Sequence, residues 1–218
     1  MVEIIPAILV KDEAEFQQQL HAVEPHAKWV QIDIVDGEFA PNVTWGDPRV
    51  IRSLTTNVKF EIDLMVSNPA TAVGDWSLPA THIGRIFFHQ ETAQGQEREM
   101  IRKIKEAGIE AGVSLSPETP LDTVFPLLGD IDVLLLLGVS PGFQGQQLQP
   151  SVLDTARAIH TSHPGLPIEV DGGVKPENIK SLADAGVRRF AVGSFIQQHS
   201  GGVKAAIDEL RRALGEVL

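Results

Sequence analysis

The stretch Val133-Leu134-Leu135-Leu136-Leu137 decides the fold class of this chain. Consecutive apolar residues of this kind are typical of a short strand that is buried on both faces, because a solvent-facing side would place a polar residue at every second position. Strands buried on both faces occur in parallel sheets that are covered by helices. We therefore expect an α/β protein built on a parallel sheet.

This stretch lies within one of eight runs rich in Val, Ile, Leu or Phe, and segments with helical periodicity, such as Phe16, Leu20 and Val23, separate many of them. The runs are Glu3–Leu9, Trp29–Ile34, Lys59–Val66, Arg85–His89, Glu110–Leu115, Asp132–Val139, Pro167–Asp171 and Arg189–Val192. Eight strand–helix units in 218 residues predict a (β/α)₈ TIM barrel that forms one domain over residues 1–218. An open doubly wound sheet is the alternative, but no G-x-G-x-x-G sequence follows the first run.

The charge and composition exclude several classes of function. A net charge of −11 repels nucleic acid and anionic membranes, and no apolar stretch is long enough to span a bilayer. A small anion can still bind at backbone N–H groups where a helix begins. The chain has no cysteine, which excludes disulfides, thiolate catalysis and Cys-ligated zinc. This composition is typical of a cytoplasmic protein, and we expect that location.

Acidic side chains recur near the ends of three predicted strands. Residues at positions i and i+2 share a face, so Asp33, Asp63 and Asp171 are each expected to point into the barrel mouth, where the active sites of such barrels lie. Gln31, Glu61 and Glu169 lie one layer deeper; for the two glutamates we favour structural ion pairs over chemistry. Helix capping or ion pairing is the alternative for the aspartates. Because three converging carboxylates repel one another, either a cation lies among them or one retains its proton.

Glycine-bearing loops follow the last three predicted strands. They contain Gly142 and Gly145, then Gly172 and Gly173, and finally Gly193 with Ser194. Glycine allows the backbone to approach a ligand closely, and phosphate groups commonly bind after strands seven and eight of a barrel. The alternative is that these glycines only turn strands into helices. We predict a phosphate site at these loops, with the stretch from Gly142 to Gln149 as a lid. His89 ends the fourth strand and is a candidate ligand contact, although a lone histidine is more often structural.

Over essentially its whole length the chain resembles the ribulose-phosphate 3-epimerase family. The segments that carry the resemblance are Pro6–Leu9, Asp33–Gly37 with Phe39, Pro41–Gly46, Asp63–Val66, Val139–Gln146 and Glu169–Val174. The resemblance implies a (β/α)₈ barrel that inverts one carbon of a ketopentose 5-phosphate through an enediolate. It also implies that Asp33 and Asp171 transfer the protons beside a divalent metal, and that Gly142, Gly172, Gly173, Gly193 and Ser194 bind the phosphate.

Two positions depart from the family pattern at the metal site. The family holds its metal with two histidines and two aspartates, and the histidine positions here are Gln31 and Asp63; a substrate-contacting serine is replaced by Ala7. We therefore predict a metal set of Gln31, Asp33, Asp63 and Asp171. Oxygen donors favour Mg²⁺ or Mn²⁺ over Zn²⁺, with a metal-free site as the alternative. Related decarboxylases carry Asp-x-Lys-x-x-Asp on the third strand, and this chain lacks that lysine.

These observations predict an isomerase that acts on a ketose phosphate, a pentulose 5-phosphate or another phosphosugar, by proton transfer between two aspartates. The alternative is a barrel that binds a phosphorylated ligand without catalysis, as the changed metal positions and Ala7 would allow. The expected partner is a small phosphorylated sugar, with no nucleic acid and no membrane. From the resemblance we also expect a homo-oligomer.

Overall fold

Eight parallel strands form a closed barrel in the computed structural model, which describes residues 2–78, 82–141 and 145–215. Every strand pairs with its neighbours in chain order, and β1 pairs with β8 to close the ring. The strands are β1 (Glu3–Ile8), β2 (Trp29–Val35), β3 (Lys59–Met65), β4 (Ile83–His89), β5 (Glu110–Leu115), β6 (Val133–Leu137), β7 (Ile168–Asp171) and β8 (Arg189–Val192). The predicted TIM barrel is confirmed, and each predicted strand agrees with an observed one within two residues at either end.

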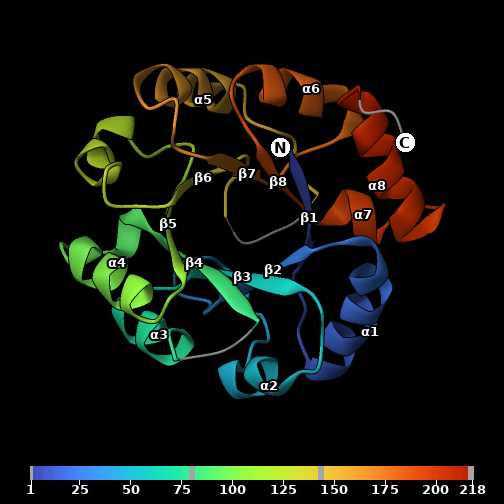
Figure 1. The fold of residues 1–218 in the computed structure, drawn as a ribbon, viewed down its shortest axis with the longest axis horizontal. Coiled ribbons are helices and arrows are strands. Elements are labelled where there is room, and N and C mark those ends of the chain that lie inside the picture. Colours follow the sequence, from blue (N-terminus) through green and yellow to red (C-terminus); the bar gives the residue numbers. More distant parts are fainter. Residues whose placement is uncertain (1, 79–81, 142–144, 216–218) are drawn as a thin grey trace.

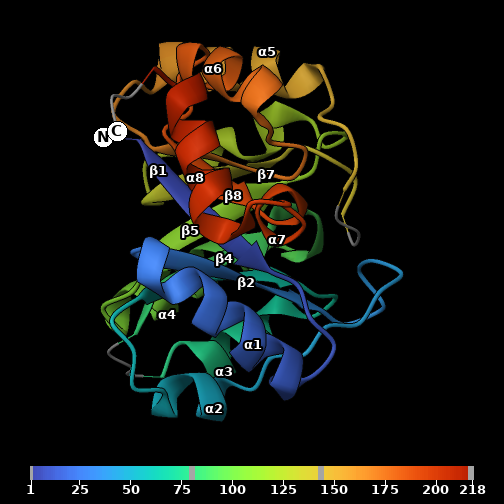
Figure 2. The ribbon, with the colours of Figure 1, turned by 90° about the vertical axis from the view of Figure 1, so that its right-hand side faces the viewer.

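Helices surround this barrel on the outside (Figure 1). They are α1 (Glu13–Val23), α2 (Pro48–Ser53), α3 (Pro69–Trp76), α4 (Glu97–Glu106), α5 (Ser151–Ser162), α6 (Pro176–Asp184), α7 (Ser194–Gln197) and α8 (Gly202–Ala213). In the view of Figure 2, α1 and α8 cover the side of the barrel where β1 closes onto β8. Within the described ranges, no helix has the length and apolarity that a membrane span requires.

The connection from β5 to β6 differs from the others because it contains no α-helix. Two 3₁₀ helices, Leu121–Thr123 and Phe125–Leu127, return the chain instead. Pro117, Pro120 and Pro126 explain this, since proline lacks the N–H of a helical hydrogen bond and disfavours helical backbone in the preceding residue. The sequence pattern of alternating strands and helices is therefore interrupted once, on the outside of the barrel.

Strand β6 contributes to two of the hydrophobic clusters found among the described residues. All five residues of β6 are buried. Val133, Leu135 and Leu137 pack with Phe87 in one cluster, while Leu134 and Leu136 belong to the large cluster that also contains the buried helix residues. Strand alternation explains the division, because successive side chains point to opposite faces. The assignment of one domain to residues 1–218 remains a proposal.

Candidate active site

Three strands bring the predicted acidic side chains into one barrel mouth. In the register of β2 and β3, Gln31 lies beside Glu61 and Asp33 beside Asp63. On β7, Asp171 is the last residue of its strand and pairs with Leu137 of β6. Asp33 and Asp63 are buried, and Asp171 is half-buried. The alternation of inward-facing residues expected for these strands is therefore observed.

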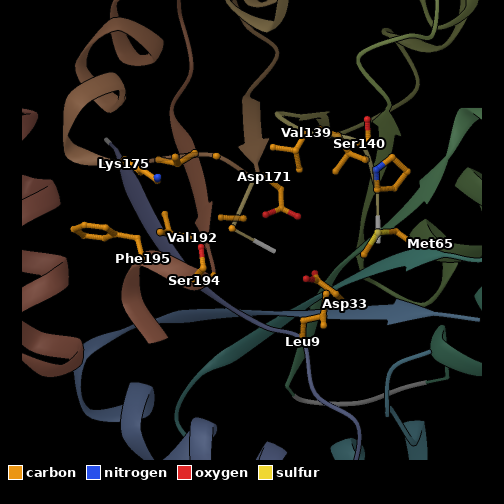
Figure 3. A pocket seen from close by; sticks show the side chains of 18 residues that line it. Leu9, Asp33, Met65, Val139, Ser140, Asp171, Lys175, Val192, Ser194 and Phe195 are labelled. Atoms are coloured by element: carbon orange, nitrogen blue, oxygen red, sulfur yellow. The ribbon is translucent and has the colours of Figure 1, made fainter. Parts of the chain in front are cut away.

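The three aspartates form one cluster. Asp33, Asp63 and Asp171 each offer a carboxylate oxygen, and these oxygens all lie within 4.8 Å of one another. Figure 3 shows the carboxylates of Asp33 and Asp171 directed toward each other from different sides of the pocket. The Nε2 atom of Gln31 donates to Asp33 Oδ1 at 2.7 Å and to Asp171 Oδ2 at 3.0 Å. One amide thus links two carboxylates that are far apart in the sequence.

The environment of these carboxyls favours proton binding. Burial, followed by the charges of Asp171 and Asp63, holds the pKa of Asp33 well above its ordinary value. Burial, followed by the charge of Asp63, raises the pKa of Asp171 to about 7. The hydrogen bonds from Gln31 oppose both shifts because they favour the ionised forms. Asp33 and Asp171 can therefore form a pair in which one carboxyl is protonated and the other is ionised.

Two residues, one from β4 and one from β5, contact the carboxylate of Asp63. Ser114 Oγ donates to Asp63 Oδ1 at 2.9 Å, and His89 Nε2 lies 3.4 Å from the same carboxylate. The other ring nitrogen of His89 lies 3.3 Å from Glu91 Oε2. Burial disfavours a charge on His89, but Asp63 and Glu91 outweigh it and raise the pKa of His89 to about 9. The ring is fully buried and, within the described residues, is not part of the pocket lining.

Sequence reasoning missed Ser114 and Glu91. Ser114 had a usable signal, because it is a polar residue at an inward-facing position near the end of β5. Glu91 follows His89 by two residues and lies beyond the strand, so nothing in the sequence placed it against the ring. His89 remains a predicted ligand contact, although the structure positions it behind Asp63.

The glutamates one layer deeper form ion pairs, as predicted. Arg85 of β4 forms a salt bridge with Glu61, and its Nη1 lies 3.5 Å from a carboxylate oxygen of Glu169. All three side chains are fully buried. Burial and the charge of Glu61 hold the pKa of Glu169 well above its ordinary value. This layer therefore has a structural role beneath the aspartate cluster.

The residues of the cluster fit a hard divalent cation. Three carboxylate oxygens converge, and oxygen is the donor that Mg²⁺ and related ions prefer. Gln31 presents its amide nitrogen to Asp33 and Asp171, while its Oε1 is buried and has no hydrogen-bond partner among the described residues. The three aspartates could therefore hold a divalent metal. The inclusion of Gln31 in that set stays a prediction.

A pocket joins this cluster to the glycine-bearing loops. Its empty space, counted together with the open mouth, is about 590 Å³. The lining includes Asp33 and Asp171 together with a set of predicted phosphate-binding residues, namely Gly145, Gly172, Gly173, Gly193 and Ser194. Gly142 lies outside the described residues. The loops and the carboxylates thus belong to one site.

The glycines after β7 are required by the backbone. Gly172 has φ +93° and Gly173 has φ +71°, in the left-handed region that other residues rarely adopt. A Cβ atom on Gly173 would lie 2.6 Å from the backbone nitrogen of Leu148. The β7–α6 loop is therefore packed closely under the β6–α5 loop, and both contribute to the pocket.

Fold and site together define a class of protein: a (β/α)₈ barrel with an acid–base cluster and glycine-bearing loops at the C-terminal mouth of its strands. Comparison with known proteins narrows the class. The family model described as the ribulose-phosphate 3 epimerase family matches residues 3–197. The chain therefore belongs to the ribulose-phosphate 3-epimerase family.

Curated relatives agree with this assignment, and a solved structure agrees with the fold. The cytoplasmic isoform of ribulose-phosphate 3-epimerase from Oryza sativa subsp. japonica is 38% identical, over 89% of this chain and 86% of its own length. Ribulose-phosphate 3-epimerase from Escherichia coli K12 is 36% identical, over 98% of this chain and 96% of its own. KGPDC from Streptococcus mutans superposes with a TM-score of 0.75 at 14% identity, over 98% of this chain and 99% of its own, which supports the fold alone.

Proposed function

We propose that this protein is a ribulose-phosphate 3-epimerase-like isomerase that inverts one carbon centre of a ketose phosphate by proton transfer between Asp33 and Asp171. The observation that carries the proposal is the placement of these two carboxyls, which face each other across a pocket lined by glycine-bearing loops. A pentulose 5-phosphate is the first substrate to test, because the relatives are named for a ribulose phosphate and the family resemblance implies a 5-phosphate. We retain the cytoplasmic location and the homo-oligomer as parts of the proposal.

The proposed reaction needs one ionised and one protonated aspartate. The ionised carboxylate removes the proton from the carbon beside the carbonyl group, and the electron pair moves onto the carbonyl oxygen to give an enediolate. The protonated carboxyl then delivers its proton to the opposite face of that carbon as the carbonyl re-forms. The two aspartates end with exchanged protonation states, and the raised pKa of Asp171, about 7, suits this exchange near neutral pH.

We propose Asp33, Asp63 and Asp171, with Gln31, as the residues that would hold a divalent cation. When bound, Mg²⁺ or Mn²⁺ would supply positive charge beside the oxygen that becomes negative in the reaction. The chain's own residues have separate tasks. Gln31 orients the two proton-transferring carboxyls, while His89 and Ser114 fix Asp63.

Exchange of carbon-bound hydrogen with D₂O tests the proposal. Ribulose 5-phosphate is incubated with the wild-type protein, with and without added Mg²⁺ or Mn²⁺, and metal content is measured by elemental analysis. We expect Asp33→Asn and Asp171→Asn each to lower epimerisation by a factor of ~10² to 10⁴, the range for loss of a general acid or base. Each variant retains one base and should therefore still exchange the C3 hydrogen of one of the two epimers. The two variants should act on opposite epimers.

The matched control is Asp154→Asn, which removes an exposed carboxylate that pairs with Arg157 on α5. It should leave both exchange and epimerisation unchanged. Near wild-type turnover in either Asp33→Asn or Asp171→Asn would refute the two-base mechanism. If the wild-type protein binds inorganic phosphate but exchanges no hydrogen with or without metal, the non-catalytic phospho-ligand-binding barrel is supported instead.

A further inference from the structure

The charged side chains of the pocket are unevenly distributed. Among its described lining residues, Asp33 and Asp171 are the acidic ones and Lys175 is the only basic one. Figure 3 shows Lys175 on the side of the pocket where Ser194 and Phe195 lie, whereas Asp33 and Met65 lie on the other side. The pocket therefore has an anionic end and a cationic end. A ligand with one anionic group can use both ends only in one orientation.

The β7–α6 loop fixes the backbone of Lys175 in place. Its N–H donates to Asn178 Oδ1 at 2.9 Å, and Asn178 Nδ2 donates to the carbonyl oxygen of Gly173 at 2.8 Å. Asn178 thus ties together both ends of the Gly173–Lys175 segment at the start of α6. Because these bonds use the backbone of Lys175, its ammonium group remains available to a ligand.

No partner for that ammonium exists in the part of the chain that the structure describes. Lys175 has no ion pair there, and its side chain is half-buried. By contrast, Lys180 on the same helix forms a salt bridge with Asp184, and Lys204 on α8 pairs with Asp208 at 2.6 Å. In a chain with 29 acidic and 18 basic residues, an unpaired lysine that lines a pocket is a candidate for contact with a ligand anion.

We propose that Lys175 is a specificity-determining residue that selects phosphorylated over unphosphorylated sugars. This role rests on the proposed function for its substrate class. The N–H groups of the glycine loops are uncharged donors, so they offer hydrogen bonds but no net charge to a phosphate dianion. The Lys175 ammonium adds that charge at the same end of the pocket. It also holds the phosphate away from the aspartate cluster, which would repel it.

The test compares Lys175→Met with the matched control Lys180→Met. Binding of inorganic phosphate is measured by calorimetry at one pH, and steady-state kinetics are measured with ribulose 5-phosphate and with free ribulose. We expect Lys175→Met to weaken phosphate binding at least tenfold and to raise KM for ribulose 5-phosphate by a similar factor, with kcat within about twofold. Rates with free ribulose should not change. Lys180→Met should match the wild type, and Lys175→Arg should recover most of the phosphate affinity.

Several results would overturn the inference. Phosphate affinity within twofold of the wild type in Lys175→Met would refute it, as would an equal loss of activity toward ribulose. A fall in kcat at unchanged KM would also refute it, because Lys175 would then act in the chemical step and not in phosphate binding. Circular dichroism and thermal melting show whether the variant is folded, and the Arg variant keeps the test valid if Met disturbs the loop. Because phosphate binding needs no turnover, a wild type that binds phosphate through Lys175 yet exchanges no hydrogen would refute the proposed function alone.

Discussion

Gln31 acts on two strands at once through a single nitrogen atom. Its Nε2 contacts Asp33 on its own strand and Asp171 on β7, and both contacts favour the ionised carboxylates. A hydrophobic residue of similar size would leave both carboxyls without this donor in a buried setting, where a lost hydrogen bond is costly. The amide therefore positions the two groups and moderates their proton affinity together.

His89 should make the protein less stable toward unfolding as the pH rises above neutral. Its pKa in the folded state is raised to about 9 from an ordinary value of 6.5, so the folded protein binds a proton more tightly than the unfolded chain. This contribution is complete below about pH 6.5 and is lost as the pH rises through about 9. Between these values, up to ~1.4 kcal/mol of unfolding free energy should be lost per pH unit.

The measurement is denaturant unfolding of the wild type and His89→Gln between pH 6 and 10, with a chelator present. The gap in stability between the two proteins should be largest near pH 6 and should shrink toward pH 10. His21→Gln, at an exposed position on α1, is the control for removing an imidazole elsewhere in the chain. A gap that is constant over this range would mean that the buried ring is uncharged.

At the scale of elements, the β7–α6 loop depends on the close approach of the β6–α5 loop. Gly173 combines a positive φ with a neighbour that leaves no room for a Cβ atom. Gly202, at the start of α8, has a similar φ of +79°, but nothing lies within 4 Å of the position that a Cβ atom would take there. A comparison of substitutions at the two glycines therefore distinguishes the effect of backbone strain from that of a steric clash.

We expect Gly173→Ala to displace the loop that lines the pocket, and so to raise the dissociation constant for inorganic phosphate at least tenfold. Its unfolding free energy should fall by ~1–3 kcal/mol, since strain and a clash add together. Gly202→Ala should cost only the strain and leave phosphate binding unchanged. Calorimetry and denaturant unfolding on both variants decide this. Equal effects in the two would show that the packing of Gly173 against Leu148 has no role in the site.

At the scale of the whole molecule, Arg85 connects strands across the barrel interior. It pairs with Glu61 of β3 and Glu169 of β7, while its Nε lies 2.8 Å from Glu110 Oε2 on β5. Its guanidinium carbon lies 4.4 Å from the centroid of the Trp29 ring. A buried network of this kind is costly to break on one side only, because the remaining charges lose their partner.

Arg85→Met should therefore lower the unfolding free energy by ~3–5 kcal/mol. Adding Glu61→Leu and Glu169→Leu to the same chain should recover much of that loss, because no buried charge then remains unpaired. Arg102→Met, which removes exposed pairs with Glu99 and Glu106 on α4, should leave the unfolding free energy close to that of the wild type, because solvent screens such pairs. Denaturant unfolding of the four proteins is the measurement. A triple variant no more stable than Arg85→Met would show that the network supplies packing rather than charge compensation.

Much of the barrel and part of the site could be predicted because their signals are local. Apolar runs such as Val133–Leu137 indicate buried strands, and the alternation in Gln31-Ile32-Asp33 indicates which residues face inward. The partners of each acid could not be predicted in the same way. Ser114 and His89 reach Asp63 from β5 and β4, and those contacts depend on strand order and register.

By itself, the sequence determined the barrel, the inward-facing acids and the glycine loops, since each follows from periodicity or from the backbone freedom of a residue type. Only the tertiary structure decided what those acids contact and where charge can be held. Gln31 meets Asp171 because β2 and β7 face one interior. Lys175 is the basic residue among the described lining of the pocket because the β7–α6 loop carries it to the barrel mouth. Burial and through-space charge set proton affinity, and both arise only when distant segments share a low-dielectric interior.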